Sequence, residues 1–284
     1  HFTFPTGEQE SDFFWGEQRT CYDSYYPFQI LSRRKLRMLD FEPVTILYGG
    51  NGSGKTTALN VIGETLKLQR DTLYNRSNFF ETYCKLCDFE TLEPIPKLSR
   101  IITSDDVFDF MLNLRSLNEG IDRKREDVFS EYLENKYARF QMRSLEDYEQ
   151  LKKVVQARSK TQSRYVRANL MDNVREHSNG ESAFLYFSEK IQENGLYLLD
   201  EPEAALSPAR LLTPMGEMDQ LVKGDSQFIV ATHSPILMAF PRARIYELSG
   251  EGVRAVEYRE TEHYQLTKRF LDDPERMLRY LLEE

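Results

Sequence analysis

The sequence predicts an α/β protein with a mostly parallel sheet and an inserted helical lobe. Short apolar runs of strand composition alternate with stretches whose apolar residues recur at helical spacing. Strands that alternate with helices usually pair in parallel, because each helix carries the chain back to the same edge of the sheet. A charged segment without proline, about 106–176, interrupts this alternation and has helical spacing of its own.

The elements are predicted in order along the chain. Residues 1–40 are rich in aromatic side chains and are expected to be irregular. Buried strands are expected at 44–47, 100–103, 196–199, 227–231 and 244–248, and helices at 56–68, 183–191 and 274–282. The predicted division is 1–105 and 177–284 for the two parts of the core, with 106–176 as the helical lobe.

Composition indicates an ordinary globular protein. Of the 284 residues 40% are hydrophobic and 29% are charged, and the net charge is −9. No run approaches the ~20 apolar residues that span a bilayer, and residues 1–10 lack the pattern of a signal peptide. The three cysteines form no disulfide framework. We therefore expect a cytoplasmic protein with no direct membrane insertion.

A phosphate-binding loop follows the first buried strand. The segment 49–56 matches G-x-x-x-x-G-K-[ST] and lies between a predicted strand and a predicted helix, as this motif requires. Its backbone N–H groups and the helix N-terminus favour a bound triphosphate, which makes ATP the expected ligand. Lys55 would reach the β- and γ-phosphates, and the Thr56 hydroxyl would bind Mg²⁺. The residues predicted to bind nucleotide here are Gly49, Gly50, Asn51, Gly52, Ser53, Gly54, Lys55, Thr56 and Thr57.

Two further strands end in residues suited to phosphate chemistry. The run 196–199 is followed by Asp200 and Glu201, and 227–231 leads to His233. In an open α/β sheet the carboxyl ends of the strands face the ligand. Asp200 is predicted to bind Mg²⁺ and Glu201 to activate water, with His233 beside the γ-phosphate. An acidic turn and a structural histidine are the plainer alternatives.

Residues 177–182 contain a capping box. Ser178 and Glu181 have the Ser-x-x-Glu spacing that caps a helix, here predicted at 183–191. A capped helix N-terminus beside Asn179 and Gly180 is also an anion-binding surface. The local capping role and a role in binding phosphate are compatible.

In this order, the motifs resemble those of the ATP-binding-cassette ATPases. The resemblance includes the loop, the run 198–202, the segment 204–207 and the run 231–233. More narrowly, the chain is similar to stand-alone bacterial ATPases of the chromosome-maintenance and recombination type, classed as AAA-family or cassette proteins, on 194–208, 231–237, 261–264 and 273–276. The resemblance covers about 40–104 and 177–284.

This resemblance implies a head-to-tail homodimer that holds two ATP molecules between its subunits. Ser178, Asn179 and Gly180 would contact the γ-phosphate held by the other copy, and Glu201, His233 and Lys55 would be catalytic. Two features depart from transporter cassettes. The signature Leu-Ser-Gly-Gly-Gln is replaced by 177–181, and Asp105 or Asp106 stands about where a metal-contacting glutamine is expected.

Other signals leave alternatives open. A stretch at 152–167 has six basic residues and no acidic one, and along a helix it suits either a DNA backbone or solvent. The aromatic that stacks on adenine could be Tyr22, Tyr25, Tyr26 or Phe28, although packing is the plainer role. Cys84 and Cys87 form a lone C-x-x-C that indicates packing rather than a zinc site.

Three functions fit these patterns. The favoured one is an ATP-hydrolysing dimerisation switch in DNA maintenance or phage defence, with an effector protein as partner. The alternative is the nucleotide-binding subunit of a membrane transporter, which the altered signature disfavours. A kinase or nucleotide sensor is disfavoured by Glu201 beside Asp200, because a kinase needs no water-activating glutamate.

Overall fold

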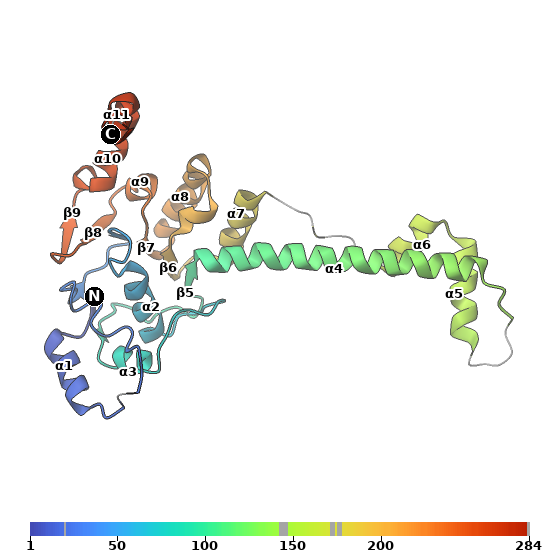
Figure 1. Cartoon of the computed structure of the whole chain (residues 1–284), viewed down its shortest axis with the longest axis horizontal. Coiled ribbons are helices and arrows are strands. Elements are labelled where there is room, and N and C mark those ends of the chain that lie inside the picture. Colours follow the sequence, from blue (N-terminus) through green and yellow to red (C-terminus); the bar gives the residue numbers. More distant parts are fainter. Residues whose placement is uncertain (20, 142–146, 171–173, 175–177, 283–284) are drawn as a thin grey trace. The chain divides into compact units, whose positions relative to one another are not determined.

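A mostly parallel sheet forms the centre of the larger of two compact units, which comprise residues 1–108 with 179–284 and residues 109–178 (Figure 1). The computed structural model describes all residues except 20, 142–146, 171–173, 175–177 and 283–284. Among these, six strands pair in the order β5-β6-β7-β3-β8-β9. They are β3 (Val44–Tyr48), β5 (Arg100–Thr103), β6 (Leu196–Asp200), β7 (Gln227–Ala231), β8 (Arg244–Leu248) and β9 (Val253–Val256). Only β9 pairs antiparallel. The predicted α/β class is confirmed.

The central strands are buried on both faces, which explains their continuous apolar sequences. Leu198 and Ile229 belong to the core that includes helix α2, whereas their neighbours Leu199 and Val230 line a cavity against other helices. Successive side chains of a strand point to opposite faces, so each strand anchors both helical layers.

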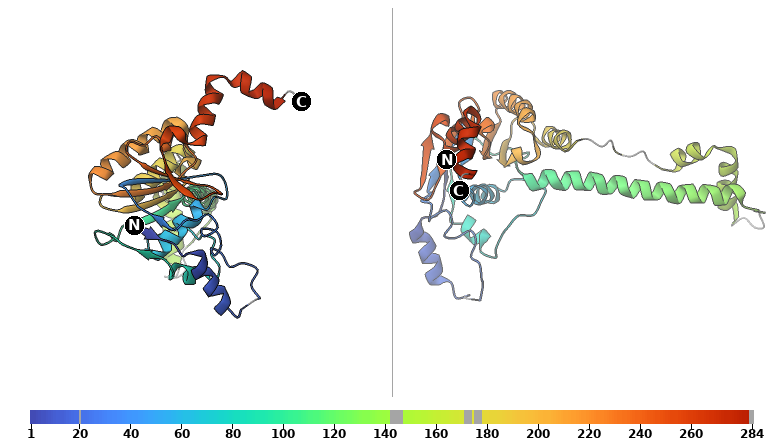
Figure 2. Two further views of the ribbon diagram at one scale, coloured as in Figure 1. Left: turned by 90° about the vertical axis from the view of Figure 1, so that its left-hand side faces the viewer. Right: turned by 45° about the horizontal axis from the view of Figure 1, so that its top comes forward.

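Helices cover the two faces of this sheet (Figures 1 and 2). Helix α2 contacts β5, β6 and β7 on one face, and α7 and α8 lie over the other. The helices of this unit outside the long α4 are α1 (Gly7–Gly16), α2 (Lys55–Thr65), α3 (Phe80–Cys84), α7 (Asn179–Lys190), α8 (Pro208–Lys223), α9 (Pro235–Met238), α10 (Glu262–Asp272) and α11 (Pro274–Leu282), with 3₁₀ turns η2 (Pro202–Ala205) and η3 (Tyr258–Glu260). The helix predicted at 183–191 begins four residues earlier, at Asn179.

The expectation that residues 1–40 are irregular is wrong. They contain α1 and two short strands, β1 (Phe2–Thr3) and β2 (Met38–Leu39), which join β4 (Asp88–Phe89) in an antiparallel sheet. Aromatic side chains stabilise the region, since Phe13 stacks on Phe28 with ring centroids 4.2 Å apart.

The smaller unit is helical. It contains most of α4 (Ser104–Tyr137), with α5 (Tyr148–Ser159) and α6 (Gln162–Asn169), around buried Tyr132, Ala157 and Tyr165. The prediction that the basic stretch lies along one helix is wrong, because α5 ends at Ser159 and α6 begins at Gln162.

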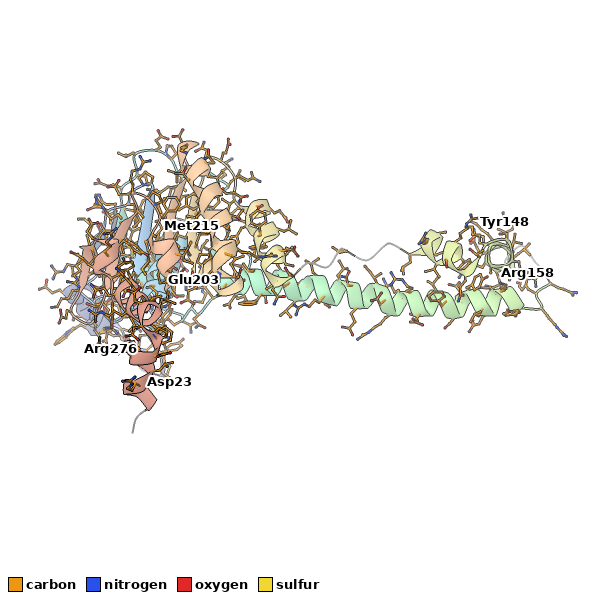
Figure 3. All side chains as sticks on the ribbon, turned by 90° about the horizontal axis from the view of Figure 1, so that it is seen from above. Asp23, Tyr148, Arg158, Glu203, Met215 and Arg276 are labelled. Carbon is orange, nitrogen blue, oxygen red and sulfur yellow. The ribbon has the colours of Figure 1, made fainter. Side chains whose placement is uncertain are left out.

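Basic side chains of the smaller unit differ in what they contact. Arg158, labelled in Figure 3, donates to the main-chain oxygen of Ala138 at 2.6 Å. Lys153 pairs with Glu131 at 2.6 Å. Lys152, Arg164 and Arg167 are exposed.

The described part of the chain contains no candidate for a membrane-spanning helix. None of its helices combines the length and the apolar character needed to cross a bilayer.

Candidate functional site

The loop between β3 and α2 folds around the side chain of Lys55, the first residue of α2. Lys55 Nζ donates to the main-chain oxygens of Gly49 and Gly50 at 2.8 and 3.3 Å. Gly52 and Gly54 have φ of 72° and 98°, a region that favours glycine. Burial lowers the pKa of Lys55, and the nearby carboxylates of Glu201 and Asp200 oppose this shift. The buried ammonium is thus held beside two acidic groups.

Thr56 and Asp200 meet across the sheet. The Thr56 hydroxyl donates to Asp200 Oδ1 at 3.2 Å, and Asp200 is the last residue of β6. Burial raises the pKa of Asp200 to about 6, while the bond from Thr56 lowers it. A hydroxyl and a carboxylate are hard oxygen ligands, and Mg²⁺ usually takes one or two protein oxygens with phosphates and water. These two side chains therefore fit the metal role predicted for them.

Glu201 and His233 lie side by side at the ends of neighbouring strands. Glu201 Oε1 is 3.1 Å from His233 Nε2, and Nε2 has no hydrogen-bond partner in the described part of the chain. Glu201 has a φ of 49°, a conformation that costs about 1–3 kcal/mol in a non-glycine residue and recurs at active sites. Burial and the ammonium of Lys55 lower the pKa of His233, which favours the neutral imidazole, while the carboxylate of Glu201 opposes this shift.

These groups share one cavity of about 330 Å³. Its lining consists of Ile30, Asn51, Gly52, Ser53, Gly54, Lys55, Thr56, Thr57, Glu201 and His233. The structure therefore brings together most of the predicted site residues, with Gly49, Gly50 and Asp200 bonded to members of the lining.

None of the four candidate aromatics lines this cavity, among the described residues. Tyr26 instead donates its hydroxyl to Thr57 Oγ1 at 3.2 Å, and Tyr25 and Phe28 pack in aromatic clusters. Ile30 is the apolar side chain in the lining of this cavity. No motif around Ile30 in the sequence indicates that it lies beside the loop.

Glu203 is a residue of this region that the sequence analysis did not single out. Its Oε1 accepts from the Thr232 hydroxyl at 2.6 Å and from the main-chain N–H groups of His233 and Ser234 at 2.7 and 3.1 Å. The carboxylate thus holds the turn that presents His233. In the sequence, the feature that could have indicated Glu203 is its place as a second acidic residue two positions after Glu201.

The predicted contacts of residues 178–180 with phosphate are not made within this cavity by Asn179 or Gly180. Asn179 and Gly180 form the start of α7 and are not in its lining, and Ser178 belongs to the smaller unit. A Cβ on Gly180 would lie 2.8 Å from Arg210 Cδ, so the glycine permits this close approach. Ser178 and Glu181 keep the spacing of a capping box, and Glu181 also lies 3.6 Å from Arg210.

The two acidic residues at the start of α4 differ. Asp106 is buried and its Oδ2 accepts from the backbone N–H and the hydroxyl of Thr103 at 2.6 and 2.9 Å. Asp105 is exposed, and neither residue lines the cavity. Asp106 therefore joins β5 to α4.

The cysteines are free thiols. Burial raises the pKa of Cys84 to about 11 and raises that of Cys87 as well. Cys84 lies in the core around α2 and Cys87 packs against it, whereas Cys21 is exposed. No cluster of three His, Cys, Asp or Glu side chains suited to a metal occurs in the described part of the chain.

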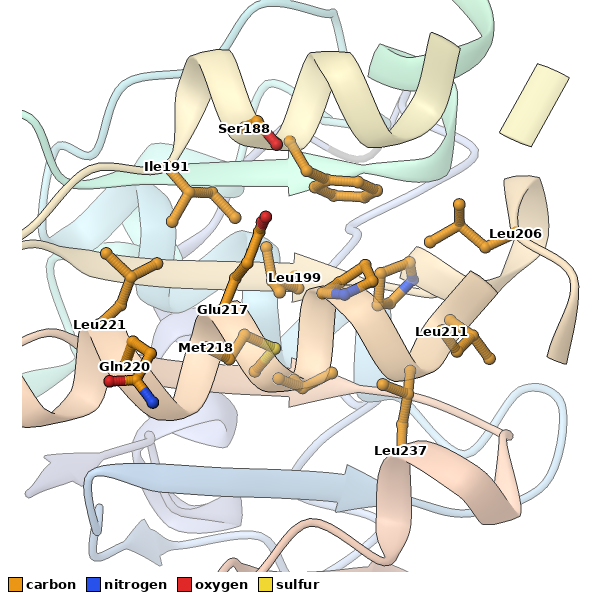
Figure 4. A pocket seen from close by; sticks show the side chains of 14 residues that line it. Ser188, Ile191, Leu199, Leu206, Leu211, Glu217, Met218, Gln220, Leu221 and Leu237 are labelled. Carbon is orange, nitrogen blue, oxygen red and sulfur yellow. The ribbon is translucent and has the colours of Figure 1, made fainter. Parts of the chain in front are cut away.

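A second cavity of about 340 Å³ lies between α7, α8 and the sheet (Figure 4). Apolar side chains such as Leu199, Leu211 and Met218 dominate its lining, together with Ser188 and Glu217. Among the described residues its lining contains no Lys, Arg or His, in contrast to the cavity at the loop, which contains Lys55 and His233.

Comparison with solved structures gives low similarity. A dimeric bacterial ABC transporter cassette is 18% identical over 79% of this chain and 90% of its own, with a TM-score of 0.39. An ATP-binding cassette described as a post-hydrolysis dimer with ADP and phosphate is 18% identical over 78% and 89%, with a TM-score of 0.35. An SMC head bound to the C-terminal winged-helix domain of ScpA is 17% identical over 77% and 91%, with a TM-score of 0.38.

Comparison with protein families gives a direct result. No curated protein matches the chain. A family model described as "AAA domain, putative AbiEii toxin, Type IV TA system" matches residues 64–239, which include Asp200, Glu201 and His233. Because this match covers more than half of the 284 residues, the chain belongs to that family of AAA-domain proteins.

Proposed function

We propose that this protein binds ATP with Mg²⁺ and hydrolyses it to ADP and phosphate. The supporting observation is the convergence of Lys55, Thr56, Asp200, Glu201 and His233 at the carboxyl ends of the adjacent strands β3, β6 and β7. Parallel strands present their ligands at this edge. The loop N–H groups and Lys55 would bind the phosphates, and Thr56 and Asp200 would hold Mg²⁺, which neutralises phosphate charge.

In this proposal Glu201 accepts the proton of the attacking water. Its carboxylate lies in the cavity that contains the loop, and the imidazole of His233 is 3.1 Å away. A neutral imidazole can donate to a phosphate oxygen and accept from water, which suits a position beside the γ-phosphate. Positioned general bases contribute about 10²–10⁴ to a rate.

We further propose that two copies enclose the nucleotide. Asn179 and Gly180 begin α7 but do not line the cavity of their own chain. A helix N-terminus favours an anion, so Ser178, Asn179 and Gly180 are suited to a γ-phosphate held by the other copy. ATP would then hold the dimer closed and hydrolysis would release it.

The biological role proposed for this switch is phage defence or DNA maintenance in the cytoplasm, with an effector protein. The family description names a type IV toxin–antitoxin system, which supports defence. A transporter subunit gains no support from that family, and the sequence at 177–181 differs from the transporter signature. DNA is the second proposed partner, through the exposed basic side chains of the smaller unit.

Replacement of Glu201 by Gln tests hydrolysis and dimerisation together. Glu201→Gln should bind ATP, lose turnover by about 10²-fold or more, and accumulate as a dimer with ATP and Mg²⁺. Phosphate release and light scattering measure the two effects. Lys55→Met is the matched control, because it keeps Glu201 but removes the phosphate-binding ammonium and should stay monomeric.

The two proposals fail on different outcomes. A Glu201→Gln protein that remains strictly monomeric with ATP and Mg²⁺ contradicts the dimer. Undiminished phosphate release by this variant would instead contradict the role of Glu201 as base.

A further inference from the structure

A second histidine lies against His233. His263 is the second residue of α10, and its ring centroid is 5.6 Å from that of His233 with an interplanar angle of 63°. The same ring is 5.2 Å from Tyr48 at 68°. Such edge-to-face pairs are attractive and set the angle between their rings. His263 therefore touches the aromatic rings that flank the nucleotide loop.

The backbone of His263 is tied to the strand that leads into the loop. Its N–H donates to Tyr48 Oη at 3.2 Å, and buried Tyr48 is the residue directly before Gly49. Just before α10, buried Thr261 donates its hydroxyl to the Tyr258 carbonyl at 2.8 Å. The start of α10 is thus anchored on β3 rather than loosely attached.

The ring of His233 has few other restraints. Its main-chain N–H is held by Glu203, but Nε2, which lies 3.1 Å from the carboxylate of Glu201, has no hydrogen-bond partner among the described residues. His263 Nδ1 is buried and without a hydrogen-bond partner among the described residues, so a ring contact rather than a hydrogen bond joins the two imidazoles.

We propose that His263 is a positioning residue, whose ring holds the imidazole of His233 toward the nucleotide cavity. This inference rests on the proposed ATP hydrolysis. The ring of His263 blocks rotation of His233 away from Glu201, and Tyr48 supports His263 from the loop side. A flat ring at position 263 is what this role requires, whereas the ring nitrogens are dispensable.

The test compares His263→Phe with His263→Leu and His263→Ala. Phe keeps a flat ring, Leu keeps much of the volume without one, and Ala removes both. We expect kcat for ATP to fall about tenfold in His263→Ala and His263→Leu with little change in KM, and to recover in His263→Phe. Tyr264→Ala is the matched control, because Tyr264 is the next residue of α10 and packs on Tyr258, with ring centroids 4.7 Å apart.

A second readout is independent of turnover. The imidazole resonances of His233, assigned by comparison with His233→Asn, should broaden or shift in His263→Ala and His263→Leu, and should stay near the wild-type position in His263→Phe and Tyr264→Ala. If wild type hydrolyses no ATP, the proposed function fails while these resonances still report the contact.

Specific results would overturn the inference. One is unchanged kcat and unchanged His233 resonances in His263→Leu. Another is a His263→Phe variant as impaired as His263→Leu, which would show that a ring nitrogen rather than a flat ring matters. If His263→Ala does not fold, the Phe and Leu variants still decide.

Discussion

Gly49 shows how closely the nucleotide loop approaches the rest of the sheet. A Cβ at this position would lie 2.3 Å from the carbonyl oxygen of Leu248 and 2.8 Å from Ser53 Oγ. The first of these atoms belongs to the backbone at the end of β8 and cannot rotate away. The loop is therefore shaped by a strand that lies far along the chain.

Gly49→Ala should destabilise the fold by about 1–3 kcal/mol, because overpacking displaces the loop or β8. It should also weaken ATP binding, since the loop oxygens that hold Lys55 would move. Urea unfolding and titration with a fluorescent ATP analogue measure the two effects. Gly50→Ala is the matched control, because a Cβ at Gly50 meets no atom within 4 Å. Equal behaviour of the two variants would contradict the steric explanation.

Glu10 carries a pH dependence that is separate from the nucleotide site. Its carboxylate is 2% exposed, and Oε2 accepts from the Gln29 N–H at 2.8 Å and the Ser32 hydroxyl at 2.7 Å. Burial raises the pKa of Glu10, which the bonds from Ser32 and Gln29 only partly offset. A raised pKa means that folding favours the protonated form, so this contribution to stability is full below the ordinary pKa of Glu and is lost as pH rises through the raised value.

Glu10→Gln should therefore be more stable than wild type at pH 8, and the gain should disappear near pH 4. The amide oxygen can still accept both hydrogen bonds, while the charge is gone. The free energy of unfolding in urea, measured from pH 4 to pH 8, gives the comparison. Glu8→Gln serves as control, because Glu8 is an exposed residue of the same helix. A constant difference at all pH values would exclude ionisation of Glu10 as the cause.

At the scale of elements, η2 and the turn after β7 act together through Glu203. Three donors of the turn converge on one carboxylate oxygen, and Thr232 is fully buried. A carboxylate accepts such bonds more strongly than a neutral group does. The turn that carries His233 is thus held by the turn that follows Glu201.

Glu203→Ala should destabilise the protein by about 1–3 kcal/mol, since it leaves buried donors without partners. It should also lower kcat, because the backbone of His233 loses its main restraint. Glu203→Gln keeps one acceptor oxygen and should retain more of both properties. Thermal unfolding and phosphate release provide the measurements. Full stability of Glu203→Ala would show that water replaces the carboxylate.

The elements differ in how far sequence alone could predict them. The central strands were the most predictable, because burial on both faces favours a continuous apolar run such as Leu196 to Leu199. The outer strand β8 carries Arg244 and Glu247 and is only partly buried. The strands β1, β2 and β4 have two residues each, which is too short for any periodicity, and their pairing depends on distant partners.

The residues of the candidate site also differ in how far the sequence could predict them. Lys55, Asp200 and Glu201 stand in local motifs, and the structure places them around one cavity or bonds them to its lining. Glu203, Ile30 and His263 acquire their positions from tertiary contacts, such as that between His263 and Tyr48, which are 215 residues apart. No local pattern encodes such a contact.

At the scale of the whole chain, charge is unevenly distributed. The net charge is −9, yet the helices of the smaller unit expose Lys152, Arg164 and Arg167. Local basic surface can bind a polyanion despite a negative total. Removal of one basic side chain that neutralises a phosphate should lower the log–log slope of affinity against salt concentration by about one unit.

Reversal of these three charges to Glu should remove salt-sensitive binding to duplex DNA, as measured by fluorescence anisotropy from about 50 to 200 mM salt. A triple reversal at Lys67, Lys85 and Lys97, exposed residues of the larger unit, changes the net charge equally and should have less effect. If wild type itself shows no salt-sensitive association, these side chains form only a solvated surface.

The contrast between Cys21 and the other two cysteines has a practical consequence. Cys84 and Cys87 are shielded thiols of raised pKa, and Cys21 is the exposed one. A maleimide dye at neutral pH should therefore attach to Cys21 alone in the folded wild-type chain. Energy transfer between donor-labelled and acceptor-labelled samples would then test whether two copies assemble with ATP as proposed.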